Sequence, residues 1–179
     1  LCAIWYVDAD STYHTVKRPG THDSDYIAVR TISGHGLLTD FNSNKYELPA
    51  NSLGIFRSDD VARYEASSDG WEFYWFRFNH DHWNEKLNWV SYLSISPSEK
   101  EDFERCFAYL NSGVIQECAM AEALFNYLLS NWFIRLNAVS QKNMPLQEII
   151  SILEKGRLQK LPLNALAKEA GMCERSFRD

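Results

Sequence analysis

The sequence predicts an α+β chain in which a small antiparallel β-barrel precedes two helices and the start of a helix-turn-helix. Residues 26–78 consist of short apolar or alternating segments separated by Gly, Asn, Asp and Pro, which is typical of barrels and sandwiches. After about residue 93 the apolar residues recur every three or four positions, as in amphipathic helices. We therefore expect a barrel over 1–95, a helical hairpin over 96–140, a linker over 141–146 and an incomplete helix-turn-helix over 147–179.

The composition is that of a globular protein. The 179 residues are 45% hydrophobic and 14% aromatic, which is ample for a packed core. The sequence has no run of about 18 apolar residues and no secretion signal at its start, so we expect a cytoplasmic protein with no membrane partner. The four cysteines are scattered and should be reduced thiols. The chain lacks an initiator Met and stops inside a helix pattern, which indicates a fragment of a longer protein.

The first half supplies the barrel strands. We expect one or two strands around AIWYV and YHTVKR, and then a series separated by turns such as SGHG and SSDG. In the segment WEFYWFRF, alternation places Trp71, Phe73 and Trp75 on one face together with Arg77. The opposite face is also mostly aromatic. The sequence therefore predicts a strand buried on both sides, with one face lining the barrel interior and the other packing on a neighbouring element.

Two helices should follow the barrel. The first begins at a Ser-Pro-Ser-Glu start and ends at Gly113, and the second covers about 117–139. Polar residues and Pro145 then predict an interruption that serves as the linker. The second helix carries a stripe that we expect to form a homodimer: Leu124, Tyr127, Leu128 and Asn131. The alternative is that this stripe is intramolecular core.

The C-terminal segment LPLNALAKEAGMCERSFRD has the pattern of a helix-turn-helix, with Gly171 suited to the sharp turn. The charge distribution also distinguishes this C-terminal segment from the rest of the chain. Residues 1–150 hold 12 Lys and Arg against 20 Asp and Glu, whereas residues 151–179 hold 6 against 4. Because nucleic-acid affinity comes largely from positive charge, the first 150 residues should not contact DNA.

This C-terminal segment resembles the first helix-turn-helix of the AraC/XylS transcription regulators, with Cys173 in place of the usual Ser. The segments VKRPGTHDSDYIAVRTISGHGLL, LPANSLGIFRSDDVARYEA and GWEFYWFRF resemble the sensor domain of the arabinose-regulator branch, in which Pro-Gly-Asp stands at Pro49-Ala50-Asn51. The resemblance implies a small jelly-roll barrel of the cupin type, a dimer formed through the second helix, and operator DNA as a partner of the intact protein. Its candidate DNA contacts are Arg175, Ser176 and Arg178.

The resemblance also implies an effector pocket inside the barrel, lined by Arg18, Tyr64, Phe73 and Trp75. Aromatic rings would cover the apolar face of a small sugar-like ligand, while Arg18 and the Tyr64 hydroxyl would bind its oxygens. Phe73 stands where the arabinose branch has an imidazole, so the ligand should be a different sugar or a less polar compound. The alternative for these aromatics is plain barrel core, and for Arg18 a surface charge.

Two other functions stay open. The His80-Asp81-His82 spacing allows a metal-dependent cupin enzyme that acts on a sugar or small acid, although this spacing without a nearby Glu is weak evidence. A barrel filled by its own aromatics would instead be a ligand-free dimerisation module. The sequence holds no catalytic motif and predicts no catalytic residue, metal or cofactor.

Overall fold

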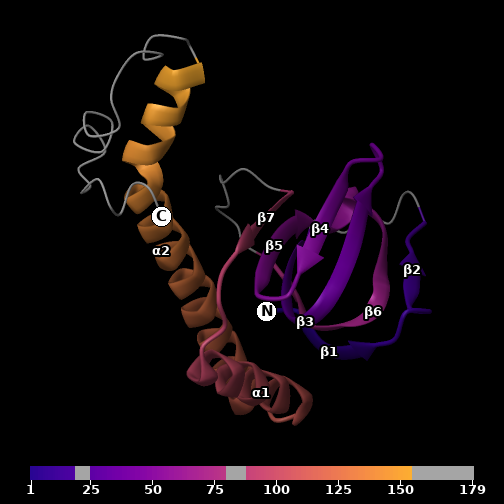
Figure 1. Cartoon of the computed structure of the whole chain (residues 1–179). Coiled ribbons are helices and arrows are strands. Elements are labelled where there is room, and N and C mark those ends of the chain that lie inside the picture. The colour runs from indigo at the N-terminus through magenta and orange to yellow at the C-terminus, as the bar shows by residue number, and fades with distance from the viewer. Residues whose placement is uncertain (19–24, 80–87, 155–179) are drawn as a thin grey trace. The chain divides into compact units, whose positions relative to one another are not determined.

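The computed structural model describes residues 1–18, 25–79 and 88–154, and it divides into two compact units, Leu1–Trp132 and Phe133–Asp179 (Figure 1). The first unit begins with two strands, as expected, and both belong to its β-sheet. The strands are β1 (Ala3–Ala9), β2 (His14–Val16), β3 (Tyr26–Asp40), β4 (Lys45–Pro49), β5 (Ser52–Arg57), β6 (Val61–Phe78) and β7 (Trp89–Tyr92). A 3₁₀ turn, η1 (Ser58–Asp60), joins β5 to β6, and the helices are α1 (Pro97–Asn111) and α2 (Ile115–Glu154).

The seven strands form one antiparallel sheet with the order β1-β6-β3-β5-β7, while β2 pairs with β6 and β4 pairs with β3. Two expected turns, SGHG and SSDG, are not turns, because each lies within a long strand. Gly34 (φ 70°) and Gly70 (φ 78°) adopt left-handed conformations, and the pairing of β3 with β6 shifts register on both sides of Gly34. Such bulges bend a strand without ending it, so β3 and β6 curve together (Figure 1).

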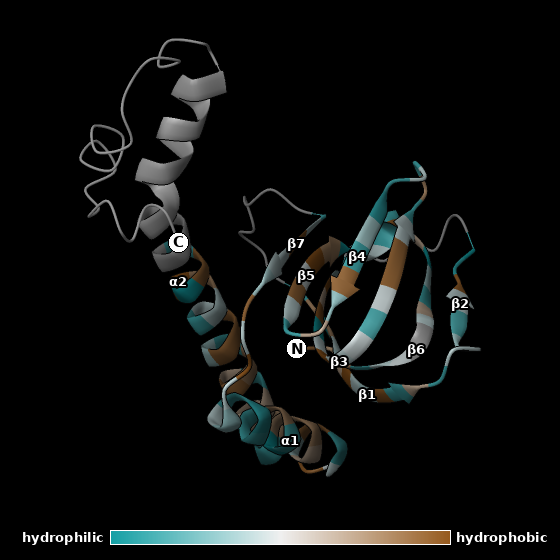
Figure 2. Ribbon diagram, viewed as in Figure 1, coloured by the Kyte–Doolittle hydropathy of each residue, from teal (hydrophilic) through white to brown (hydrophobic). Residues whose placement is uncertain are grey.

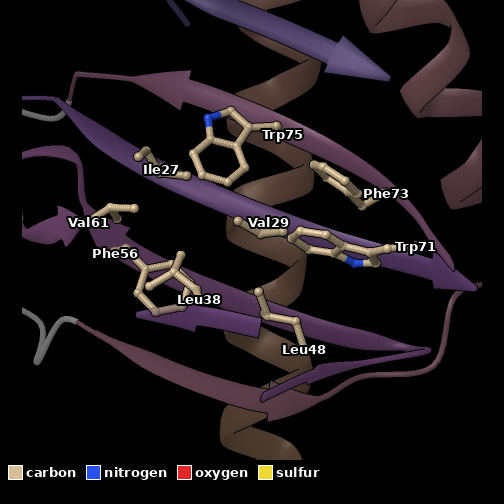
Figure 3. Packing of buried hydrophobic residues seen from close by; sticks show 9 residues of the cluster. All are labelled: Ile27, Val29, Leu38, Leu48, Phe56, Val61, Trp71, Phe73 and Trp75. Atoms are coloured by element: carbon tan, nitrogen blue, oxygen red, sulfur yellow. The ribbon is translucent and has the colours of Figure 1, made fainter. Parts of the chain in front are cut away.

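The core lies inside this curved sheet. The buried cluster draws residues from both ends of the bent strands: Ile27, Val29, Leu38, Leu48, Phe56, Val61, Trp71, Phe73 and Trp75 (Figure 3). Strand β5 is buried on both faces from Ser52 to Phe56, and its Leu, Ile and Phe residues give the brown parts of its ribbon in Figure 2. The mostly β architecture followed by two helices is consistent with the predicted cupin-like jelly roll.

The two faces of β6 are used as predicted. Phe73 and Trp75 point into the interior cluster, whereas Phe76, on the opposite face, packs against the helices. The ring centroid of Phe76 lies 5.7 Å from that of Phe103 in α1 and 5.2 Å from that of Phe125 in α2. Alternation along one strand therefore places a core on each side of the sheet.

Helix α1 starts as its sequence predicts. Pro97 occupies the first helical position, and the Ser96 hydroxyl accepts a hydrogen bond from the Glu99 amide at 3.1 Å. Helix α2 is longer than predicted and continues through 141–146, so the expected interruption at Pro145 is absent from the backbone. A proline removes one helical donor, and a helix can continue past it with that hydrogen bond missing. The domain boundaries expected there stay a prediction.

Candidate ligand-binding site

One end of the barrel interior contains a cavity of about 250 Å³. Strands β1 and β6, the segment around β2 and the turn η1 surround most of it. The residues that line it are Trp5, Val7, Tyr13, Lys17, Ile27, Ser58, Tyr64, Phe73, Trp75 and Arg77. Three of the four residues expected in a pocket, Tyr64, Phe73 and Trp75, therefore lie around the same space.

Aromatic rings form one wall of the cavity. Tyr64 and Trp75 lie with their ring centroids 4.4 Å apart and their planes 32° apart. Tyr13 continues this wall, at 6.2 Å from both Tyr64 and Phe73. Because Tyr64 and Trp75 belong to opposite ends of the bent strand β6, the bend itself brings these rings together.

Cations lie on another side of the cavity. The Lys17 ammonium donates hydrogen bonds to the carbonyl oxygen of Ser58 at 2.9 Å and to its hydroxyl at 2.7 Å. The Arg77 guanidinium is ion-paired with Asp25. The expected cation was Arg18, but Arg18 is exposed and does not line the cavity. Alternation explains the difference, since Tyr13, Thr15 and Lys17 are half-buried while His14, Val16 and Arg18 are exposed.

The hydroxyl groups of the site are neutral donors. Burial is the main cause that raises the pKa of Tyr64 above its ordinary value of 10.0. Its phenol therefore keeps its proton at neutral pH and can donate a hydrogen bond to a ligand oxygen. Ser58 is 1% exposed and is held by Lys17 at the cavity wall.

The other end of the interior is packed. Trp71 stacks on Phe73 with a centroid distance of 3.8 Å, and its indole nitrogen donates to the Thr31 hydroxyl at 3.1 Å. Gly36 makes room for this ring, because a Cβ there would lie 2.3 Å from it. In Figure 3, Trp71 lies among Val29, Leu48 and Phe73. The interpretation of a barrel filled by its own aromatics thus describes this end and not the end with the cavity.

A buried polar network joins the outer face of the sheet to both helices. The Arg30 side chain of β3 is fully buried, and its Nε donates to Glu99 Oε1 at 2.9 Å. Trp132 of α2 donates its indole N–H to the same oxygen at 2.8 Å. Sequence reasoning missed this network. The available signal was a lone Arg inside an apolar strand, which requires a buried acid as its partner.

The residues expected at a dimer interface do not share one environment. Leu128 is 1% exposed and belongs to the core, so it is not available as a surface contact. Leu124 and Asn131 are partly exposed, and Tyr127 is 58% exposed. Met120, at 51% exposed, lies seven residues before Tyr127. Leu128 is therefore part of the core, whereas Met120 and Tyr127 lie on the exposed side of the same helix.

Some expected residues lie outside the described ones. These are His80 and His82 of the metal hypothesis and the candidate DNA contacts Arg175, Ser176 and Arg178. Within the described ranges, no group of three or more His, Cys, Asp or Glu residues is arranged to hold a metal ion. Cys2, Cys106 and Cys118 are free thiols. Among the helices of the described residues, none is both long and apolar enough to cross a membrane.

Comparison with known proteins identifies the family. The family model for the AraC-like ligand binding domain matches residues 1–128, whereas no curated protein matches the chain. Among solved structures, YhaK from Escherichia coli is 13% identical, with a TM-score of 0.41, over 52% of this chain and 42% of its own length. An apo ToxT variant from Vibrio cholerae is 12% identical, with a TM-score of 0.47, over 98% of this chain and 72% of its own.

Wild-type ToxT bound to an unsaturated fatty acid is 13% identical, with a TM-score of 0.42, over 98% of this chain and 70% of its own. The chain thus covers less than half of YhaK and roughly seven tenths of ToxT. The family model covers more than two thirds of the chain, including every residue that lines the cavity. The protein belongs to the family of AraC-like ligand-binding domains.

Proposed function

We propose that this chain is the effector-sensing part of an AraC-type transcription regulator. The observation that carries the proposal is the cavity of about 250 Å³, bordered by aromatic rings and by Lys17, inside a domain of a ligand-binding family. A small molecule, sugar-like in the expectation from sequence, binds there. The intact protein binds operator DNA through the helix-turn-helix, with Arg175, Ser176 and Arg178 as candidate contacts.

The sheet offers a route from ligand to helices. Phe73 and Trp75 border the cavity, while their neighbours on β6, Tyr74 and Phe76, contact Phe103 of α1 with centroid distances of 5.0 and 5.7 Å. A ligand that shifts β6 therefore also shifts the surface on which α1 and α2 pack. The ligand changes regulation to the extent that it binds one arrangement of the helices better than another.

A second copy of the chain binds the exposed stripe of α2. Met120, Leu124, Tyr127 and Asn131 are spaced by four, three and four residues, which is the spacing of a two-stranded coiled-coil seam. Tyr127→Glu should convert dimers to monomers in sedimentation, while Asn126→Glu, on an exposed position outside the stripe, should leave dimers intact. If the Tyr127→Glu chain remains dimeric, this stripe is not the dimer interface.

Ligand binding is tested by calorimetry and tryptophan fluorescence with a panel of neutral sugars and small organic acids. At least one class should bind with one site per chain, and Trp75→Leu should abolish both the heat and the fluorescence change. Tyr92→Leu serves as the control, because Tyr92 is 68% exposed on β7 and does not line the cavity. No heat and no fluorescence change with any compound would overturn the sensing function.

A further inference from the structure

We propose that residues 10–17, which we call the strap, form the gate of the cavity and open it when β2 separates from β6. The strap leads from the end of β1 through β2 and covers one side of the cavity. This inference rests on the proposed function only for the compound that enters. The opening itself is measured without a ligand, so it can fail while the sensing function stands.

The strap is a wall of the cavity that is one chain thick. Tyr13 and Lys17 line the cavity, whereas His14 and Val16 are exposed, Val16 at 70%. Because both of these outer side chains are exposed, none of the described elements covers the strap from outside. Figure 1 shows β2 at the edge of the sheet, beside β6. Displacement of the strap therefore opens the cavity directly to solvent.

The strap is attached to the sheet along one edge. Its strand, β2, has three residues and pairs, among the described strands, only with β6. Beside this ladder, the Ala66 amide donates to the Tyr13 carbonyl at 3.0 Å, and the Lys17 amide donates to the Ala62 carbonyl at 2.8 Å. By contrast, the part of β6 that carries Trp75 is paired with β1 on one side and with β3 on the other. Separation of the strap therefore breaks fewer backbone hydrogen bonds than displacement of that part of β6.

The two ends of the strap are held differently. At its start, the Asp10 carboxylate accepts hydrogen bonds from the amide and the hydroxyl of Thr12 at 2.8 and 2.6 Å, and the Asp10 carbonyl accepts one from the Tyr13 amide at 3.1 Å. These bonds lie within the strap, so the turn stays formed when the strap moves and acts as a hinge. At the other end, the Lys17 ammonium donates to the carbonyl and hydroxyl oxygens of Ser58 and fastens the strap to η1.

The cavity needs a gate because most of its lining is closed to solvent. Among its ten described lining residues, Trp5 is exposed, at 47%, and the others are half-buried or buried. Trp5 lies on β1, which pairs with residues 71–77 of β6, whereas β2 pairs with residues 63–65. The strap spans the gap between these two paired regions. Its Tyr13 ring lines the cavity there, with its centroid 6.2 Å from that of Tyr64.

A disulfide that fastens the strap to β6 tests the gate. Val16 and Arg63 are register partners, and both are exposed. Their pair adjoins Lys17 and Ala62, which are joined by a backbone hydrogen bond, so it is a non-hydrogen-bonded pair. The Cα atoms of such a pair lie about 4.5 Å apart, within the range that a disulfide spans. Val16→Cys with Arg63→Cys, once oxidised, therefore holds the strap closed.

The measurement is the reactivity of a thiol placed inside the cavity of the 179-residue chain. Ile27 lines the cavity and is 1% exposed, so the thiol of Ile27→Cys reacts with iodoacetamide when the cavity opens. Cys2→Ser removes an exposed native thiol, and peptide mass spectrometry resolves the others. Without the disulfide, position 27 should react at least about tenfold faster than buried Cys106, because local opening requires less free energy than unfolding. The disulfide should slow the reaction at position 27 at least about tenfold, and its reduction beforehand should restore the rate.

A second disulfide provides the matched control. Thr39→Cys with Lys45→Cys joins register partners of β3 and β4, beside the hydrogen-bonded Asp40 and Asn44. It leaves the strap free and should leave the reaction at position 27 unchanged. Val7→Cys repeats the measurement at a second lining position, and circular dichroism checks the fold of each variant.

Each of three results overturns the gate. Equal rates at position 27 and at Cys106 before the disulfide forms would mean that only unfolding exposes the cavity. An unchanged rate at position 27 after the strap disulfide forms would mean that the cavity opens elsewhere, and equal slowing by both disulfides would assign the effect to general stabilisation. If a compound of the calorimetric panel binds in any of these cases, the gate fails and the sensing function stands. If no compound binds while the strap disulfide alone slows the reaction, the gate stands and the sensing function fails.

Discussion

The inner and outer faces of the same two strands, β3 and β6, have different tasks. On the outer face the side chains of Ala28, Arg30 and Phe76 are completely buried beneath the helices. On the inner face, Phe73 and Trp75 are nearly as buried but border an open cavity. Period-two alternation lets neighbouring residues stabilise the fold and bind a ligand independently. Substitutions on the outer face should therefore lower stability, and those at the cavity should lower ligand affinity.

The largest effect is expected on the outer face, at Glu99. Glu99→Leu leaves the Arg30 guanidinium fully buried without its carboxylate and also removes the acceptor of the Trp132 indole. The loss of one partner of a buried pair costs about 3–5 kcal/mol. Urea unfolding of the chain measures this loss as a lower midpoint.

Two further variants test the cause. Glu101→Leu changes an exposed acid in the same helix and should alter stability by less than about 0.5 kcal/mol. The double variant Arg30→Met with Glu99→Leu removes both charges and should recover most of the stability, because apolar pairs often replace buried ion pairs without loss. A double variant as unstable as Glu99→Leu would assign the effect to packing instead of charge.

The bend that creates the cavity comes next in size. Gly34→Ala combines a left-handed backbone with a Cβ 2.3 Å from the Gly70 carbonyl oxygen, so it should cost about 2–5 kcal/mol. Gly113→Ala has nearly the same φ, 73°, but no atom within 4 Å of the new Cβ, and should cost only about 1–2 kcal/mol. Equal losses in urea unfolding would mean that close approach of the strands is unimportant.

Much of the fold could be predicted from local sequence. The capping sequence at Ser96 and the alternation in WEFYWFRF each predict the structure around them, since capping and strand periodicity act over a few residues. The continuous strands through SGHG and SSDG could not be predicted in this way. Gly34 and Gly70 are compatible with either a turn or a β-bulge. Pairing with a strand that is distant in the sequence determines which of the two forms.

The candidate site was predictable to a similar degree. The aromatic members Tyr64, Phe73 and Trp75 were expected from a resemblance, and the structure places them around one cavity. Arg18 was expected from the same resemblance, whereas Lys17 lines the cavity. Which of these two adjacent cations points inward depends on the phase of the strand before them, and a resemblance alone does not fix that phase. The sequence pattern of α2 likewise could not show that Leu128 is buried, because the buried side of a helix depends on how the helix packs.

A smaller effect is expected from pH at Cys106, which is buried in helix α1. Burial raises the pKa of Cys106 from 9.0 to about 12. The unfolded chain then loses this proton at lower pH than the folded chain, so the stability contribution is complete below pH 9 and is lost as pH rises towards 12. The slope of stability against pH reaches at most about 1.4 kcal/mol per pH unit. Urea unfolding from pH 8 to pH 10.5 should show this slope, and Cys106→Ala should reduce it.

Thiol labelling checks the burial of Cys106 directly. Iodoacetamide at pH 8 should label exposed Cys2 and spare buried Cys106. Rapid labelling of both thiols would contradict the burial of Cys106.

The smallest change in stability is expected at the cavity. Tyr64→Phe removes a hydroxyl that borders the cavity and keeps the ring that lies 4.4 Å from Trp75, so unfolding should change by less than about 1 kcal/mol. Affinity for the compound of the calorimetric panel that binds should nevertheless fall by roughly threefold to tenfold, the amount expected for one neutral hydrogen bond. Tyr127→Phe, on the exposed side of α2, should change neither quantity. A stability loss above about 2 kcal/mol with unchanged ligand affinity would mean that the Tyr64 hydroxyl stabilises the fold and does not bind the ligand. The division of the sheet into a stabilising outer face and a binding inner face would then be wrong at Tyr64.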